Sequence, residues 1–201
     1  MDLFSSETRQ NLLPYDGIAD YHGIILNRSD ADHYLDRLLY TVDWRNDEAK
    51  IMGKHIVTKR KVAWYGDKTY AYTYSNTTKY ALPWTKELTE LKNLIEQLVH
   101  TRFNSCLLNL YHNGSEGMAW HSDDEKTLSK NAVIASVSLG AEREFSLRHK
   151  VTRQSVSQVL AHGSLLVMKG ETQTYWQHRL PPTKKVTRPR INLTFRSILA
   201  T

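Results

Sequence analysis

The segment WHSD at residues 120–123 has the side chains and the spacing of a metal site. Residues two apart on an extended strand face the same side, so His121 and Asp123 can hold one metal ion together. His178, at the end of the strand-like segment 175–178, is the best candidate for a third ligand. Two imidazoles and one carboxylate form the facial triad of non-haem Fe(II) oxygenases, which leaves positions open for substrate and oxygen. Taken alone, a His-x-Asp pair is more often a surface histidine beside a solvated acid.

The segment RINLTFR at residues 190–196 alternates polar and apolar side chains with the period of a β-strand. If its apolar face packs on protein, its polar face presents two guanidinium groups, an amide and a hydroxyl, from Arg190, Asn192, Thr194 and Arg196. Guanidinium groups bind carboxylates through paired hydrogen bonds, so this strand could hold a dicarboxylate at both ends. An exposed strand with ordinary charges is the alternative, and the candidate metal site upstream makes it the weaker one.

These side chains need a β framework to bring them together. Beyond residue 105, short segments rich in branched and aromatic residues are separated by turns, at 106–111, 132–139, 144–148, 156–160, 164–168, 175–178 and 190–198. Many short strands favour an all-β sandwich or barrel, jelly rolls included. Upstream, we expect an irregular arm over residues 1–20, a helix capped by Ser29 that runs to about Tyr40, and a helix from Thr85 to about His100. Gly53 could form a tight turn between two short strands.

The motifs together resemble the AlkB family, whose members are Fe(II)- and 2-oxoglutarate-dependent dioxygenases that repair alkylated nucleic acid. The resemblance rests on HSD at 121–123, the distal His178, and RINLTFR at 190–196. Asn109-Leu110-Tyr111 is similar to the family's upstream Asn-x-Tyr element, and the blocks 134–140 and 161–165 are similar to its core strands. The resemblance covers roughly residues 50–198 in the family's order.

The resemblance implies an α+β fold with a mainly β core, a double-stranded β-helix (jelly roll) with N-terminal helices and a nucleotide-recognition lid. It implies one domain over residues 1–201, with an N-terminal extension at 1–49, the lid and hairpin at 50–80, and the jelly-roll core at 104–198. Fe(II), 2-oxoglutarate as cosubstrate and molecular oxygen are the implied cofactors. The implied catalytic iron ligands are His121, Asp123 and His178, and the residues around 2-oxoglutarate are Asn109, Tyr111, Arg190, Asn192, Thr194 and Arg196. We expect Arg196 near the metal-chelating end and Arg190 at the distal end.

Within the family, the chain is most similar to the branch that repairs duplex DNA. Residues 51–54 lie where that branch has a hydrophobic hairpin inserted into the helix, here with Met52 and Gly53. Tyr72 and Tyr74 match the lid that contacts the flipped base, and Asp124 and Glu125 follow the metal motif as candidates for contacts to the base edge. Basic runs at 59–61, 148–153 and 184–188 are candidates for phosphate contacts.

The implied activity is direct DNA repair by oxidative demethylation of 1-methyladenine and 3-methylcytosine, with base flipping and with release of formaldehyde and succinate. The expected partners are duplex and single-stranded DNA with alkylated bases, RNA being a further candidate, and we expect a monomer. A related oxygenase that acts on RNA, protein or a small molecule is the main alternative. A non-catalytic binder is disfavoured because every proposed metal ligand and both arginines are present.

Composition agrees with these expectations and excludes other classes. Hydrophobic residues make up 40% of the 201 residues and charged residues 24%, which excludes wholesale disorder. The formal net charge of +6 favours polyanionic partners, and the single Cys106 excludes a disulfide framework or a cysteine-rich zinc site. No secretory signal or bilayer-spanning run is apparent, so we expect an intracellular protein without membrane contact, cytoplasmic if bacterial and nuclear if eukaryotic.

Overall fold

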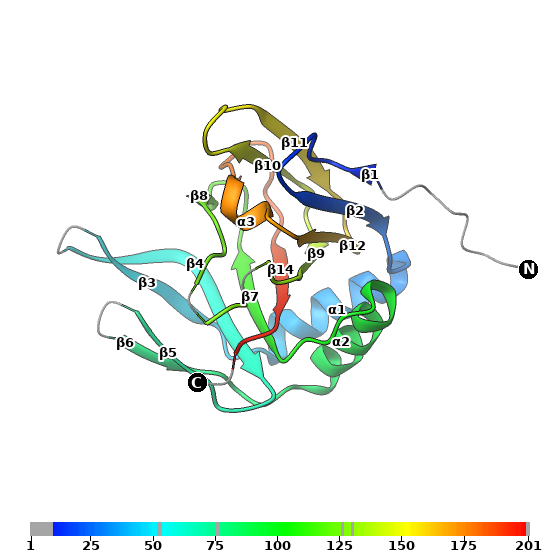
Figure 1. The fold of residues 1–201 in the computed structure, drawn as a ribbon. Coiled ribbons are helices and arrows are strands. Elements are labelled where there is room, and N and C mark those ends of the chain that lie inside the picture. The colour runs from blue at the N-terminus through cyan, green and yellow to red at the C-terminus, as the bar shows by residue number, and fades with distance from the viewer. Residues whose placement is uncertain (1–9, 52–53, 75–76, 126, 130, 200–201) are drawn as a thin grey trace, which may run out of the picture.

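Two antiparallel sheets form the body of the protein (Figure 1). The structure, a computed structural model, describes residues 10–51, 54–74, 77–125, 127–129 and 131–199. In this part of the chain, the major sheet consists of β1 (Gln10–Asn11), β2 (Ile18–Ile24), β12 (Ser164–Lys169), β9 (Ile134–Gly140), β14 (Arg190–Arg196), β7 (Ser105–Tyr111), β4 (Lys54–Gly66) and β3 (Arg45–Ile51), in that spatial order. The minor sheet consists of β11 (Ser155–Leu160), β10 (Arg143–His149), β13 (Trp176–Leu180) and β8 (Met118–His121). A separate hairpin pairs β5 (Ala71–Tyr74) with β6 (Thr77–Tyr80).

Two apolar clusters join these layers. One cluster contains residues from both sheets, among them Leu166, Leu147 and Trp176, so the sheets pack face to face. The other contains residues of α1 (Arg28–Thr41), α2 (Lys86–Val99) and the major sheet, so the two helices cover the outer face of that sheet (Figure 1). The short α3 (Thr172–Tyr175) leads into β13. Two facing antiparallel sheets with helices on one outer face confirm the expected jelly-roll core.

The central strand β14 has the predicted alternation. It pairs along its whole length with β7 and nearly so with β9. Its apolar side chains, Ile191, Leu193 and Phe195, are fully buried in the cluster beneath the helices. Burial of side chains of this size stabilises the fold by roughly 1.5–3 kcal/mol each. This packing fixes which face of β14 turns inward between the sheets, and the polar side chains must lie on that face.

The helices agree with the expected ranges, with one correction at a cap. α2 begins after Thr85, whose hydroxyl accepts a hydrogen bond from the Leu88 N–H at 3.3 Å. α1 is capped by Asn27 and not by Ser29, because the Asn27 side chain accepts the Asp30 N–H at 2.9 Å. Asn and Ser are almost equally good cap residues, so preference alone does not choose between neighbouring candidates.

Two further boundaries differ from expectation. The arm expected over residues 1–20 is not irregular throughout: residues 10–11 form β1, and residues 18–20 begin β2, which pairs with β12 at Ala19↔Met168. β2 is a strand because β12 supplies partners for its backbone, and that contact spans more than a hundred residues of sequence. Tyr175 belongs to α3, so β13 begins at Trp176 and His178 lies in the middle of the strand, not at its end.

The region expected to form a hairpin and lid contains two antiparallel pairs. β3 and β4 pair up to Ile51↔Lys54, and the hairpin residues Met52 and Gly53 lie outside the described residues. β4 then continues into the major sheet beside β7, with Val62 opposite Asn109. β5 contains Tyr72 and Tyr74, but the side chains of residues 49–56 and 72–79 are outside the described part. No helix in the described ranges has the length and apolarity needed to cross a membrane.

Candidate active site

His121, Asp123 and His178 converge between the two sheets. β8 and β13 pair at His121↔His178, and the centroids of these two rings lie 4.2 Å apart. The Asp123 carboxylate lies 3.7 Å from His121 Nε2 and 4.0 Å from His178 Nε2. One potential ligand atom from each residue lies within 4.8 Å of the others. The three residues predicted from spacing therefore form a group that fits one metal ion.

The charge states of the group suit a divalent cation. Burial lowers the pKa of His178 to about 4, so its imidazole is neutral at pH 7 and has a lone pair to donate. Burial alone would raise the pKa of Asp123, but the Arg196 guanidinium and the two imidazoles outweigh it and hold the pKa below its ordinary value. A neutral imidazole beside a carboxylate is the protonation state that metal binding requires.

Hydrogen bonds that the sequence did not predict orient the ligands. His121 Nδ1 lies 2.9 Å from the Ala119 carbonyl, a contact that places the proton on Nδ1 and leaves Nε2 free for a metal. The Asp123 backbone N–H donates to Gln173 Oε1 at 2.8 Å. Ser122 Oγ donates to the Trp176 carbonyl at 3.0 Å. The segment after β8 is thereby fixed to α3 and β13.

The polar face of β14 forms the second part of the site together with β7. The strands are in register, with Asn192 opposite Asn109 and Arg190 opposite Tyr111. Arg190 donates to Asn192 Oδ1 at 3.0 Å, and Asn192 Nδ2 donates to Thr194 Oγ1 at 2.8 Å. A serine that sequence reasoning missed, Ser138 of β9, accepts from Arg190 at 2.9 Å. All these side chains share the space between the sheets with the metal group.

The two arginines of β14 have unmet hydrogen-bonding capacity. Among the described residues, Arg190 Nε and Arg196 Nε are buried without a hydrogen-bond partner. Burial also lowers the pKa of Arg190 to about 10. Buried donors and buried charge are costly when unpaired, and a carboxylate satisfies both. The site therefore fits an anionic ligand with two acceptor ends.

The ends of β14 differ in what surrounds them. Arg196 lies at the metal end: its charge acts on Asp123, and its Nη1 donates to Glu125 Oε1 at 2.8 Å. Arg190 lies six residues before Arg196 on β14, and its guanidinium carbon is 5.6 Å from the centroid of the Tyr111 ring. Arg196 is therefore the arginine of β14 that acts on the metal group.

Arg60, one of the residues at 59–61 expected to contact phosphates, is not available for that role. Its side chain turns inward, forms an ion pair with Asp47 and donates to Asn109 Oδ1 at 2.8 Å. Arg60 is only 8% exposed. It lies on the same face of β4 as Val62, which is opposite Asn109, so strand phase directs it into the interior. The bond uses the carbonyl oxygen of the Asn109 side chain and not its N–H₂ group.

The acidic residues after the metal motif line a cavity of about 370 Å³ beside Asp123, together with Lys150 and Gln173. Asp124 is exposed, whereas Glu125 is tied to Arg196 through Oε1. The second oxygen of Glu125, Oε2, is buried without a partner in the described part of the chain.

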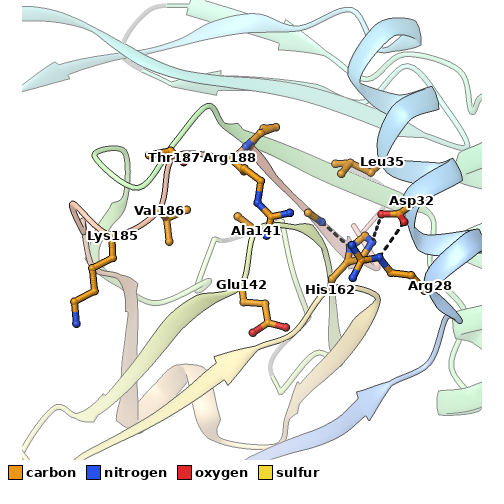
Figure 2. Close-up of a pocket in the computed structure, with 12 residues that line it drawn as sticks. Arg28, Asp32, Leu35, Ala141, Glu142, His162, Lys185, Val186, Thr187 and Arg188 are labelled. Atoms are coloured by element: carbon orange, nitrogen blue, oxygen red, sulfur yellow. Dashed lines mark hydrogen bonds and ion pairs between the residues drawn. The ribbon is translucent and has the colours of Figure 1, made fainter.

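His162 does not belong to the metal group. It lines a second cavity, of about 330 Å³ (Figure 2), and its Nε2 lies 3.0 Å from Asp32 Oδ1. Its Nδ1 accepts the Gly140 N–H at 2.8 Å. Arg28 and Arg188 line the same cavity (Figure 2). The histidine thus joins α1 to the end of β9.

Comparison with known proteins agrees with this geometry. The family described as the 2OG-Fe(II) oxygenase superfamily matches residues 18–196. The chain is 36% identical over 211 residues to the DNA oxidative demethylase ALKBH2 of Mus musculus, covering 100% of this chain and 87% of that protein. It is 40% identical over 179 residues to the alpha-ketoglutarate-dependent dioxygenase alkB homolog 3 of Homo sapiens, covering 84% of this chain and 62% of the relative.

The solved structure of OsALKBH1 has the same fold, with a TM-score of 0.62 at 15% identity over 92% of this chain and 99% of that one. At that identity the likeness concerns the fold alone. The family match, by contrast, spans both the metal group and the arginine strand. The chain therefore belongs to the 2OG-Fe(II) oxygenase superfamily and is an Fe(II)- and 2-oxoglutarate-dependent dioxygenase of the AlkB type.

Proposed function

We propose that this dioxygenase repairs DNA by oxidative removal of methyl groups from 1-methyladenine and 3-methylcytosine. The observation that supports this proposal most directly is the convergence of a three-residue metal group and two buried arginines in one interior space. Relatives that match most of the chain are named as DNA oxidative demethylases.

His121, Asp123 and His178 hold the iron in this proposal. Fe(II) bound there, with 2-oxoglutarate and oxygen, would supply the oxidation that converts an N-methyl group into a hydroxymethyl group, which leaves as formaldehyde, with succinate and carbon dioxide as coproducts. The protein's part is to keep His178 neutral, Asp123 ionised and His121 oriented through the Ala119 carbonyl. These features organise the ligands before the metal arrives.

2-Oxoglutarate lies along β14 in this proposal. Arg190 binds its distal carboxylate, because this guanidinium is buried and has an unpaired Nε. Arg196 binds near the metal-chelating end, where its positive charge also stabilises the ionised carboxylate of Asp123. The remaining polar contacts come from Asn109, Tyr111, Asn192 and Thr194.

The alkylated base enters from the side of Asp124 and Glu125. Both target bases are cationic at neutral pH, and a carboxylate nearby compensates that charge. Glu125 Oε2 is buried, has no partner among the described residues, and can accept a hydrogen bond from the exocyclic amino group. Tyr74 is our candidate for stacking on the base, with Tyr72 in polar contact with its edge. We infer that the base is flipped out, because its methylated edge lies inside a duplex.

DNA binding outside the pocket relies on exposed cations and on the β3–β4 hairpin. Lys184, Lys185 and Arg188 are exposed in the segment before β14, and such charges bind phosphates without sequence preference. Met52 and Gly53 fill the space that the flipped base leaves. We further propose that residues 1–201 act as one domain and as a monomer.

The test is turnover on defined oligonucleotides. Formaldehyde and succinate release is measured with Fe(II), 2-oxoglutarate and 3-methylcytosine in duplex DNA, single-stranded DNA and RNA, for wild type and Asp123→Ala. Demethylation of DNA that depends on iron, cosubstrate and Asp123 is the expected result. Succinate release without demethylation of any oligonucleotide would move the substrate to a protein or a small molecule.

The hairpin has its own test. Met52→Ala is expected to reduce repair of duplex DNA more than repair of single strands, because only a duplex needs its gap filled. Val57→Ala, an exposed change on β4, is the matched control. Equal losses on both substrates would contradict the role of Met52.

A further inference from the structure

β8 is the element that holds the metal group least firmly by its backbone. It has four residues and lies at the edge of the minor sheet in the described part of the chain, with β13 as its one neighbour. The pairing with β13 shifts register between His178 and Leu180. Short edge strands with few backbone hydrogen bonds open locally more easily than central strands. Yet β8 contains His121 and leads directly to Asp123.

The outer face of β8 has a contact that the metal group does not explain. Trp120 precedes His121, so the two side chains point to opposite faces of the sheet. The guanidinium carbon of Arg148 lies 4.2 Å from the centroid of the Trp120 ring, and that of Arg179 lies 4.5 Å from it. These three residues, which we call the outer clamp, come from β8, β10 and β13.

Part of each guanidinium in the outer clamp is shielded from solvent. Arg148 Nε and Arg179 Nε are both buried and have no hydrogen-bond partner among the described residues. Cations over an indole ring bind more strongly when water is excluded. Arg179 follows His178 just as Trp120 precedes His121, so the clamp lies directly behind the pair of imidazoles that meet at 4.2 Å.

We propose that Trp120 is a positioning residue for the metal group: it fastens edge strand β8 to β10 and β13 through Arg148 and Arg179 and so fixes His121 opposite His178. The inner face contributes the bonds from Ser122 to Trp176 and from Asp123 to Gln173, both beyond the end of the strand. The outer clamp, by contrast, holds a residue within β8 itself. This inference rests on the metal-binding role proposed for His121, Asp123 and His178.

The experiment measures binding of Co²⁺ alone to the full chain, by calorimetry and by the visible absorption of the bound ion, at a temperature where every variant is folded. Trp120→Ala is expected to weaken Co²⁺ binding about 10-fold, the lower end of the effect of residues that support metal ligands. It is also expected to alter the absorption spectrum, which reports ligand geometry. Trp120→Phe keeps a ring for the two guanidinium groups and is expected to lose less.

Trp84→Ala is the matched control, because Trp84 makes a comparable contact with Lys92 at 5.1 Å but packs beside the helices. It should leave Co²⁺ affinity and spectrum unchanged. If Trp120→Ala does not fold, the double change Arg148→Met and Arg179→Met removes the charges and keeps the side-chain stems, with the same loss expected.

Two outcomes separate the possible errors. If Co²⁺ binding is lost in Asp123→Ala but Trp120→Ala or the double methionine variant binds as wild type does, the clamp is wrong and the metal site stands. If wild type and Asp123→Ala bind Co²⁺ equally, the metal site itself is wrong, and the clamp fails with it.

Discussion

Replacing Arg190 with Met tests whether this arginine exists for a ligand or for the fold. Arg190 is 2% exposed, and its Nε has no partner in the described part of the chain. Burial lowers its pKa to about 10 from 12.5. That difference corresponds to about 3 kcal/mol by which the site disfavours the charged guanidinium relative to water. The protein without cosubstrate therefore contains a charge that the interior tolerates poorly.

The magnitudes follow from the contacts that Met would remove. Arg190→Met loses hydrogen bonds to Ser138 and Asn192, each worth about 1 kcal/mol. It also removes the buried charge, and the stability gained by this is about equal to the stability lost with the two hydrogen bonds, or slightly larger. We expect the free energy of unfolding without cosubstrate to stay within about 1 kcal/mol of wild type. Loss of one partner of a buried charge pair costs at least about 2 kcal/mol in binding, so 2-oxoglutarate should bind about 30-fold more weakly or worse.

Two assays measure the expected changes in stability and in affinity for 2-oxoglutarate. Urea denaturation gives the free energy of unfolding, and calorimetry with Co²⁺ in place of Fe(II) gives the affinity for 2-oxoglutarate. Arg188→Met, an exposed arginine two residues away, is the control and should change neither quantity. Binding of 2-oxoglutarate within about threefold of wild type would refute the ligand role. A loss of more than about 3 kcal/mol of stability would show that Arg190 is structural.

Three other outcomes are expected. The pKa of His178 is about 6.5 in the unfolded chain and about 4 in the folded protein, so the unfolded chain takes up the proton first as the pH falls. The free energy of unfolding should therefore be highest above pH 6.5 and should fall by up to about 3 kcal/mol as the pH approaches 4. Urea denaturation across this range should show a shallower decline for His178→Gln. Burial raises the pKa of the Cys106 thiol, so iodoacetamide at pH 8 should label Cys106 only after denaturation, and rapid labelling of the folded protein would contradict its burial. Asn27→Ala should cost about 1 kcal/mol of stability in urea denaturation and Ser29→Ala much less, and the reverse order would restore Ser29 as the cap.

The parts of the site that sequence predicted share one property: local pattern determines their direction. Alternation places Arg190 and Arg196 on the same face of β14 because the intervening apolar side chains have only one core to enter. His121 lies at the end of β8, whereas Asp123 lies beyond that strand and is held by Gln173, so alternation does not set its direction. Their meeting with His178 depended on the resemblance to a family as much as on spacing.

The parts that sequence missed depend on partners distant in the chain. Arg60 lies in a run of three basic residues, and only the pairing of β4 with β7 decides that it points inward to Asn109. Gln173 contacts Asp123 across fifty residues, and no local pattern marks it. β2 was missed because its longest pairing is with β12, more than a hundred residues away in the sequence.

The place of β14 in the major sheet has a consequence for how the protein is made. Its partners β7 and β9 flank it on both sides, yet it is one of the last segments of these 201 residues to be synthesised. A nascent chain that stops before residue 190 has a sheet with a gap at its centre and lacks both arginines. Exposed edges of β7 and β9 would then be free to pair with other chains. Synthesis must therefore pass residue 196 before the site can exist, and pauses shortly before that point should favour aggregation.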